Sequence, residues 1–394
     1  MSIFEKTPAL RWAVPVVTAV ALVGGGSAVS GIVSGIHASA DAGLPVRSAA
    51  QLLVDVQQAR LDGLSGNVVQ KADLGLPTLP VAGSSGGTAS SDLTSLISGT
   101  HTMRVWFAGP DKARTALLGT LGESDVIRNG QDVWVWASQT KTAKHYVLPT
   151  PGPAGTGGTT SGMPGPTDVP TSPQAAAEKA LAVITPSTEV ATSGTATVAG
   201  RSAYELVLKP KETTSLVAQV RVAIDGTRHV PLRVQVFAKK VADPVFEVAF
   251  SAVDFARPDA AQFTFRPPPG TTVTEAKMPT PGKAPAGSKT NTVAPQPSSA
   301  DMPKVIGTGW GSVVVVTMPA PNATAGTSSS TGATTDKTIA QLMKYVGLLP
   351  KVSGSWGSGH LMAGTVFSAL LTDDGRLVVG AVTPEALYAA LSAK

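Results

Sequence analysis

The chain has 394 residues, which is enough for one large domain or two ordinary ones. Its charged fraction of 14% is low for a soluble protein, and its glycines and prolines gather in blocks, so the folded part is shorter than the chain. The net charge of +5 is spread without a basic cluster, which argues against a nucleic-acid-binding protein. The absence of cysteine excludes disulfides, thiolate metal sites, thiol catalysis and a lipid-modified N-terminal cysteine.

The first 40 residues have the features of a segment that directs export. Lys6 and Arg11 precede an uncharged apolar run at 12–36, and residues 38–40 read Ala-Ser-Ala before an aspartate. This order predicts a signal peptide cleaved after the Ala-Ser-Ala tripeptide. An uncleaved membrane anchor is the alternative, because the run of about 25 residues is enough to span roughly 30 Å of hydrocarbon. Either way, we expect the rest of the chain to be secreted or to lie on the outer face of the cytoplasmic membrane.

The first folded element is expected to be a helix over residues 48–61. Ser48 is suited to cap its N-terminus, and Leu52, Leu53 and Val56 fall on one apolar stripe at helical spacing. From residue 64 the sequence changes to the alternation of apolar and polar residues that is typical of strands. The first series of strands is expected at 64–74, 99–109, 112–119, 124–138 and 138–148, with a loose insertion at 78–91 and a hairpin turn at Asn129-Gly130.

A second series of strands follows a low-complexity segment. Residues 149–173 are rich in Pro, Gly, Ser and Thr and are predicted to be a linker or a long disordered loop. A short helix is expected next, over 174–184. The strands of the second series are expected at 187–198, 201–210, 216–226, 230–240, 245–255 and 261–267. Closely spaced strands with turn signals between them predict one meandering antiparallel sheet.

The last hundred residues contain a further set of elements. Residues 278–300 form a second Pro/Gly/Ser linker, and a loose segment is expected at 319–335. The other elements expected here are a strand at 309–317, a helix from Asp336 to Gly347, a hairpin over 359–382 that turns at 373–375, and a closing helix from Thr383.

These elements predict a mainly β fold of the α+β class. About a dozen strands form one large sheet, which must curl, and the few short helices are expected to cover its concave face. Trp134 and Trp136 lie two positions apart, so a strand presents both rings on one face. Val133 and Val135 occupy the other face, and a strand that is apolar on both faces is covered on both sides. Alternation alone does not decide which face is concave.

The chain carries no recognisable catalytic or cofactor motif. Its five histidines are scattered, and no two lie at metal-ligand spacing. There is no P-loop and no dinucleotide-binding glycine pattern. Residues 83–87 match a nucleophile elbow by letter, but they sit in the loose insertion rather than between a strand and a helix. We therefore expect a protein that is not an enzyme and needs no metal or cofactor.

The stretch MRVWFAGPDKARTALLGTLGESDVIRNGQDVWVWASQTKTAKHYV begins at Met103 and resembles the LolA/LppX/RseB-like superfamily of exported lipoprotein and lipid carriers. The shared pattern is a strand with an aromatic residue before Gly109-Pro110, basic Lys112 and Arg114, and the hairpin around NGQDVWVW. The later VAGRSAYELVLKP and VPLRVQVF are similar to the second half of the family. The resemblance covers roughly residues 45–270, and LLTDDGRLVVGAVTPEALYAAL looks like the C-terminal extension of actinobacterial relatives.

The resemblance implies a curved half-barrel of about eleven antiparallel strands, with helices over its concave apolar face and a cavity for acyl chains. It places the half-barrel at 41–277, and we expect residues 301–394 to complete its sheet or to cap its cavity. The implied function is that of an extracytoplasmic, monomeric carrier of a lipid or an acylated lipoprotein. The alternative is an RseB-like regulator that binds the outer segment of a membrane anti-sigma factor, a type that usually has a separate second domain.

The residues expected to line the cavity are the apolar ones on the cleaner strand and helix faces. At each position a role in a filled core is the alternative to contact with a ligand. The set is Leu52, Leu53, Val56, Val105, Phe107, Leu117, Trp134, Trp136, Leu206, Leu208, Val222, Val234, Val248 and Phe250.

Overall fold

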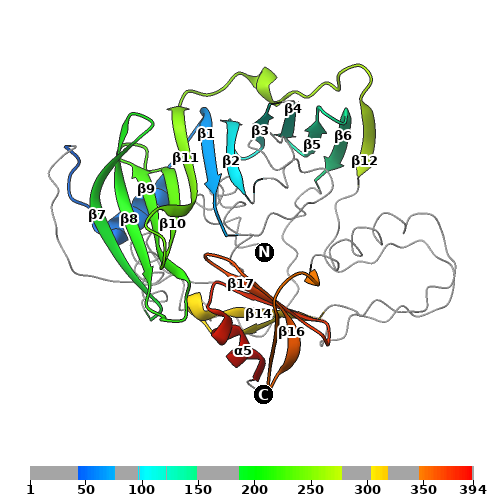
Figure 1. Ribbon diagram of the computed structural model, residues 1–394. Coiled ribbons are helices and arrows are strands. Elements are labelled where there is room, and N and C mark those ends of the chain that lie inside the picture. The colour runs from blue at the N-terminus through cyan, green and yellow to red at the C-terminus, as the bar shows by residue number, and fades with distance from the viewer. Residues whose placement is uncertain are drawn as a thin grey trace, which may run out of the picture.

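A computed structural model describes residues 43–75, 96, 98–120, 122–148, 186–276, 303–317 and 346–392 (Figure 1). The strands within these residues form one sheet of 12 strands and one of six. Several predictions lie wholly or almost wholly outside the described residues: the export segment, the insertion at 78–91, the linkers at 149–173 and 278–300, the loose segment at 319–335, and the helices expected at 174–184 and from Asp336.

The large sheet runs in the order β12-β6-β5-β4-β3-β2-β1-β11-β10-β9-β8-β7. Its strands are β1 (Leu64–Ala72), β2 (Gly99–Phe107), β3 (Lys112–Gly119), β4 (Gly122–Asn129), β5 (Asp132–Ala137), β6 (Thr142–Val147), β7 (Thr188–Val198), β8 (Arg201–Pro210), β9 (Val217–Asp225), β10 (Pro231–Ala238), β11 (Pro244–Asp254) and β12 (Thr272–Ala276). All neighbours pair antiparallel except β12, which lies parallel to β6. The sheet arches from β7 to β12 and stays open (Figure 1), which confirms the predicted mainly β half-barrel.

Helix α2 (Ala49–Gln58) packs on one end of this sheet. Ser48 caps it as predicted: its Oγ accepts from the Gln51 backbone N–H at 3.2 Å, and the Gln51 side chain accepts from the Ser48 N–H at 2.9 Å. Leu52 is fully buried, in a cluster with Tyr204 and Leu206 of β8. We call the side of the sheet on which α2 packs the helix face, and the other side the opposite face.

The helix face is apolar over much of its width. Strand register places Leu206, Val222, Val234 and Val248 in one row across β8, β9, β10 and β11. The next positions in this row are Gln70 on β1 and His101 on β2, both buried. The Gln70 side chain donates to the Leu96 carbonyl at 2.6 Å, and the His101 Nε2 lies 2.8 Å from the Ser98 carbonyl oxygen. This row therefore ends in two buried polar residues near the middle of the sheet.

The prediction of a strand at 261–267 is wrong. The chain forms a 3-10 turn there, η4 (Ala260–Phe263), in which the Asp259 carboxylate accepts from the Ala261 N–H at 2.7 Å. Phe263 is buried and Phe265 packs on the two tryptophans of β5, so the alternation of aromatic residues reflects packing onto the sheet. The chain then reaches β12, a short strand that the sequence pattern did not indicate.

Residues 303–392 form a small sheet of their own, in the order β13-β14-β18-β17-β16-β15. Its elements are β13 (Lys304–Ile306), η6 (Gly309–Gly311), β14 (Val313–Thr317), β15 (Lys351–Gly354), β16 (Gly357–Ala363), β17 (Ser368–Thr372), β18 (Arg376–Gly380) and α5 (Pro384–Ser392). Leu370, Val378 and Leu387 are fully buried in a core between this sheet and α5. Within the described part of the chain, these strands do not extend the large sheet, contrary to the first of the two roles expected for residues 301–394.

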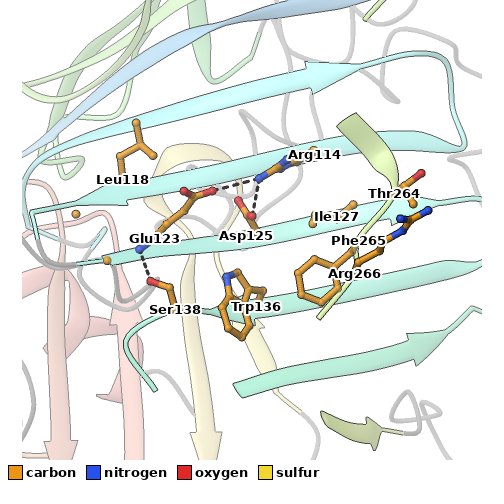
Figure 2. A pocket seen from close by; sticks show the side chains of 12 residues that line it. Arg114, Leu118, Glu123, Asp125, Ile127, Trp136, Ser138, Thr264, Phe265 and Arg266 are labelled. Carbon is orange, nitrogen blue, oxygen red and sulfur yellow. Dashed lines mark hydrogen bonds and ion pairs between the residues drawn. The ribbon is translucent and has the colours of Figure 1, made fainter. Parts of the chain in front are cut away.

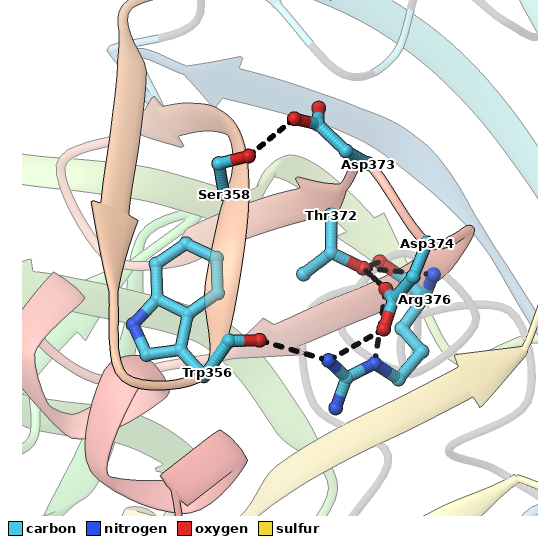
Figure 3. Close-up of polar contacts among 6 residues, drawn as sticks. All are labelled: Trp356, Ser358, Thr372, Asp373, Asp374 and Arg376. Carbon is cyan, nitrogen blue, oxygen red and sulfur yellow. Dashed lines mark hydrogen bonds and ion pairs between the residues drawn. The ribbon is translucent and has the colours of Figure 1, made fainter.

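The turn between β17 and β18 lies where the sequence predicts it, at 373–375 (Figure 3). The Thr372 Oγ1 accepts from the Arg376 backbone N–H at 2.9 Å, and Gly375 has a φ of 86°, a left-handed conformation that favours glycine. The Arg376 guanidinium donates to the Trp356 carbonyl at 3.2 Å and pairs with Asp374 at 2.7 Å. These contacts fasten the turn to the neighbouring β15–β16 hairpin.

The small sheet is attached to one end of the large sheet. The Leu216 N–H donates to the Ala381 carbonyl at 2.9 Å, and the Thr383 N–H donates to the Thr214 carbonyl at 2.9 Å. A third backbone hydrogen bond, from Thr365 to the Leu74 carbonyl, is 2.8 Å long. Next to this third bond, the buried side chain of Val366 packs into the apolar core of the large sheet. Small-sheet residues thus cover the end of the large sheet where β1 and β8 finish.

The two described α-helices are both short, with ten residues in α2 and nine in α5. No helix within the described ranges is long and apolar enough to cross a membrane.

Candidate functional site

Nine of the predicted cavity residues lie on strands and face the same way. Register places Val105, Phe107, Leu117, Leu206, Leu208, Val222, Val234, Val248 and Phe250 on the helix face. They fall into two neighbouring groups. Val105, Phe107, Val248 and Phe250 belong to the main core cluster, whereas Leu206, Leu208 and Val222 belong to the cluster under α2. Leu117 is fully buried, and Val234 lies in the row between the two groups.

The helix contributes two of its three predicted residues to the same surface. Leu52 and Val56 pack in the cluster under α2. Leu53 is half-buried and is not a member of that cluster. The structure therefore brings eleven of the fourteen predicted residues to the helix face, a grouping that alternation predicted without knowing which face α2 would occupy.

Trp134 and Trp136 lie on the opposite face, so they cannot line a cavity with the other predicted residues. Trp136 pairs with Asp125 on β4, and Val135, between the two tryptophans, points to the helix face. The Phe265 ring covers both indoles, with ring centroids 5.2 Å from Trp134 and 5.9 Å from Trp136. The prediction that the two tryptophans join the other cavity residues is wrong because β5 is apolar on both faces. Its sequence therefore does not show which face lies on the side of α2.

His145 on β6 connects Trp134 to the edge strand β12. Its ring stacks on the Trp134 indole at 4.2 Å. Its two ring nitrogens each lie 2.9 Å from a carboxylate, Nε2 from Asp132 and Nδ1 from Glu275 of β12. Both nitrogens donate only in the charged imidazolium, so this geometry favours the protonated ring. Burial lowers the pKa of His145, but its hydrogen bonds to Asp132 and Glu275 outweigh burial and raise the pKa above 6.5.

We expect the attachment of β12 to depend on pH. A raised pKa means that the contribution of His145 to stability is complete below pH 6.5 and is lost as the pH rises through the raised value. NMR titration should therefore place the His145 midpoint above 6.5, and amide protection factors of β12 should fall over the same range. The variant His145→Gln should abolish this dependence while leaving protection of β9 unchanged. A midpoint at or below 6.5 would contradict the expectation.

A cavity of about 650 Å³ lies on the opposite face, over β3, β4 and β5 (Figure 2). We call it the opposite-face cavity. Its floor carries Arg114, Glu123, Asp125 and Trp136, and the segment 264–266 forms one wall. A second cavity, of about 380 Å³, lies near the turn between β2 and β3. Of the fourteen predicted residues, Trp136 alone lines either of these two cavities in the described part of the chain.

The opposite-face cavity contains a charge cluster in which Asp125 is buried and Arg114 and Glu123 are partly exposed. The Arg114 Nη2 donates to the Asp125 carboxylate at 2.7 Å and to the Glu123 carboxylate at 3.2 Å, and the Arg114 guanidinium also lies over the Trp106 ring. Asp125 is 3% exposed. Its burial raises its pKa to about 6; Arg114 opposes this rise and the neighbouring Glu123 adds to it. One guanidinium thus donates to two carboxylates. Its positive charge does not fully offset the effect of burial on the Asp125 carboxyl, whose pKa stays raised.

Sequence reasoning missed this cluster. Glu123 and Asp125 share a face of β4, and Arg114 lies opposite Ile127 two positions along the same face. The signal in the sequence is a pair of acidic residues two positions apart on one strand, next to an apolar residue. Their pairing with Arg114 could not be predicted, because it depends on the register of β3 and β4. No group of three or more His, Asp or Glu residues in the described ranges is arranged to hold a metal ion.

Comparison with known proteins gives matches by structure. No protein-family model matches the chain, and no curated protein matches it by sequence. The structure of the MucA/MucB complex of Pseudomonas aeruginosa matches with 14% identity and a TM-score of 0.38, over 87% of this chain and 94% of that chain.

Two further matches cover about half of this chain. A LolA superfamily protein from Nitrosomonas europaea matches with 10% identity and a TM-score of 0.20, over 56% of this chain and 99% of that one. A putative outer membrane lipoprotein-sorting protein domain from Vibrio parahaemolyticus matches with 11% identity and a TM-score of 0.19, over 51% and 88%. The solved structures similar to this chain thus include a LolA superfamily protein and the MucA/MucB complex.

Proposed function

We propose that this protein is a non-catalytic carrier outside the cytoplasm that holds the acyl chains of a lipid or a lipoprotein against the helix face. The observation that carries the proposal is the row of apolar side chains across four adjacent strands, Leu206, Val222, Val234 and Val248. A second apolar row, formed by Leu208, Val220 and Val236, lies beside the first.

The apolar rows suit a flexible hydrocarbon chain. Val105, Phe107, Val222 and Val234 are only half-buried among the described residues, so they retain surface that a ligand can cover. Burial of an acyl chain gains about 0.8 kcal/mol for each methylene, so eight methylenes contribute roughly 6 kcal/mol. Gln70 and His101 end this row with buried polar side chains, so the acyl chains are expected to lie along the apolar part of the row.

The predicted export segment supports the same proposal. The apolar run at 12–36 with basic residues before it has the order of a signal peptide or an anchor, and both place the folded sheets outside the cytoplasm. A carrier of acyl chains works at membrane surfaces, so the proposed location and the proposed ligand agree.

Photo-cross-linking with a fatty acid tests the proposal, because it identifies the residues that contact the acyl chain. We expect palmitate with a diazirine in its chain to cross-link to the purified, exported protein at Val220, Val222, Val234 and Val236. The alternate residues Arg221 and Gln235 lie on the same strands but face the other way, so they are matched internal controls. Peptide mass spectrometry reads the cross-linked positions, and native mass spectrometry of the untreated protein should reveal a lipid that dissociates on denaturation.

Two results would oppose the carrier. Cross-links spread equally over both faces would indicate nonspecific contact. A bare protein mass that remains bare after incubation with mixed lipids would indicate that the helix face is a filled core.

An RseB-like regulator is the second candidate. Its support is the small sheet, which has a core of its own around Leu370, Val378 and Leu387 and is attached to the end of the large sheet. The resemblance implies such a second domain for regulators of this type. Recovery of a membrane protein on the immobilised exported protein, and its release by added lipid, would favour the regulator; recovery that lipid does not affect would oppose it.

A further inference from the structure

The opposite-face cavity is separate from the surface proposed for acyl chains. The sheet itself lies between them, because Trp136 and Asp125 face one way while Val135 and Val126 face the other. A ligand in this cavity therefore does not contact the surface proposed for acyl chains, and the two sites can be tested independently.

The charge cluster of the cavity has two carboxylates but one guanidinium. Asp125 and Glu123 carry two negative charges, and the guanidinium of Arg114 supplies one positive charge to both. Arg266 also lines the cavity, but its side chain is exposed to solvent, where water screens its charge. The cluster thus carries one negative charge more than Arg114 neutralises.

An unused hydrogen-bond acceptor marks the same place. The Oδ2 atom of Asp125 accepts from Arg114, but its Oδ1 atom is buried and has no hydrogen-bond partner among the described residues. A buried acceptor of this kind is costly, and a donor placed there removes the cost. The most stabilising donor is a charged one, because an N–H group that carries positive charge also neutralises the carboxylate.

Aromatic rings supply a matching wall. Trp136 and Phe265 line the cavity, and their rings lie 5.9 Å apart at an angle of 44°. The faces of aromatic rings attract organic cations and also pack against the methylenes next to them. A volume of about 650 Å³ accommodates such a group together with several carbon atoms.

We propose that the opposite-face cavity binds a protonated amine or guanidinium, with its N–H groups on the Asp125 carboxylate and its carbon atoms against Trp136 and Phe265. A free amine and the side chain of a lysine or arginine in a polypeptide present the same chemistry. An anion is a poor occupant, because the two carboxylates beside Arg114 repel it and already accept hydrogen bonds from the Arg114 guanidinium.

NMR of the tryptophan indole N–H groups tests the proposal on the intact exported protein. We expect n-butylammonium to shift the Trp136 signal, assigned with Trp136→Phe, at millimolar concentrations, and n-butanol of the same chain length to leave it unshifted. A blocked tripeptide with central lysine distinguishes the sources: tighter binding of the peptide than of n-butylammonium indicates a polypeptide, and equal or weaker binding indicates a free amine. Equal shifts with butylammonium and butanol, or none with any amine, would overturn the proposal.

Substitution of the carboxylate gives the second test. Asp125→Asn keeps the shape and removes the charge, so we expect the dissociation constant for n-butylammonium to rise at least tenfold. Asp111→Asn is the matched control, because this aspartate is exposed and lies outside the cavity, and its affinity should equal that of the unchanged protein. Unchanged affinity in Asp125→Asn would refute the assignment.

Two further variants keep the test decisive if Asp125→Asn does not fold. Glu123 is partly exposed, so Glu123→Gln should fold and weaken amine binding several-fold. Phe265→Leu removes one aromatic wall and should also weaken it. Normal affinity in both variants would contradict the proposal. Among the described residues, the charged groups that line the cavity with Asp125 are Arg114, Glu123 and Arg266. With all three present, amine binding should weaken as the pH falls below about 6.

Discussion

Asp225→Ala is expected to lower the free energy of unfolding by about 3–5 kcal/mol, the usual effect of breaking a buried ion pair. Asp225 is 1% exposed at the end of β9. Its carboxylate receives two hydrogen bonds from Arg201 and two from the backbone N–H groups of Thr227 and Arg228, at 3.0 and 2.6 Å. The substitution removes the acceptor of all four, leaves the guanidinium of Arg201 without its partner and loosens the turn between β9 and β10.

The pH dependence of this effect has a definite direction. Burial raises the pKa of Asp225, but hydrogen bonds from Arg201, Arg228 and Thr227 outweigh burial, so the pKa lies below 3.8. The stabilisation is therefore complete above pH 3.8 and is lost as the pH falls through the lowered value. Urea unfolding of the two proteins should show a large difference at pH 7 that shrinks in acid. Asp111→Ala, at an aspartate that is 70% exposed, should change stability by less than about 0.5 kcal/mol. Equal effects of both substitutions would contradict this account.

Phe263→Ala is expected to destabilise the protein by about 3–5 kcal/mol, as large-to-small changes of buried aromatic residues do. Phe263 is 1% exposed in η4, which contacts β3 and β4 on the opposite face. Its loss leaves a void under the segment that carries Phe265 over the two tryptophans. Thermal unfolding measures the loss, and a red shift of tryptophan fluorescence should accompany it, because water then reaches the indoles.

The matched control for Phe263→Ala is Val273→Ala on β12, where the side chain is 43% exposed. This variant should stay within about 0.5 kcal/mol of the unchanged protein. A small effect of Phe263→Ala together with unchanged fluorescence would indicate that η4 does not hold the 264–266 segment in place.

Most strands could be predicted from the sequence because their signals are local. The turn at Asn129-Gly130 is an example: Gly130 has a φ of 64°, and Asn129 pairs with Asp132 in a two-residue hairpin. The cap at Ser48 is another, since Ser48 and Gln51 supply both halves of a capping box within four residues. Signals of this kind do not depend on the rest of the fold.

Features that depend on distant pairing could not be predicted. β12 is short and its pairing with β6 joins residues far apart in the chain, for example Glu275 with His145. The face occupied by Trp134 was undetermined, because the valines beside it are equally apolar. The opposite-face cavity needed the register between Arg114 and Asp125, which only the paired strands supply. The separation of the small sheet from the large one could not be predicted, because its strands are short and the sequence pattern allowed them either to complete the large sheet or to cap its cavity.

The order of strands in the large sheet has a consequence for the newly made chain. β1 to β6 form one run of neighbours and β7 to β11 another, and the two runs meet only where β1 pairs with β11. At that seam the Ser251 hydroxyl donates to the Asn67 carbonyl across 184 positions of the chain. Closing so long a loop carries a higher entropic cost than forming any of the hairpins, so the seam is expected to close late.

Until β11 has been synthesised, β1 is therefore an unpaired edge that carries apolar Val68 next to Val105 of β2. Such an edge pairs readily with other chains and leads to aggregation. This edge therefore stays unpaired while residues 73–254 are added to the chain, and its protection is a requirement for efficient assembly of this protein.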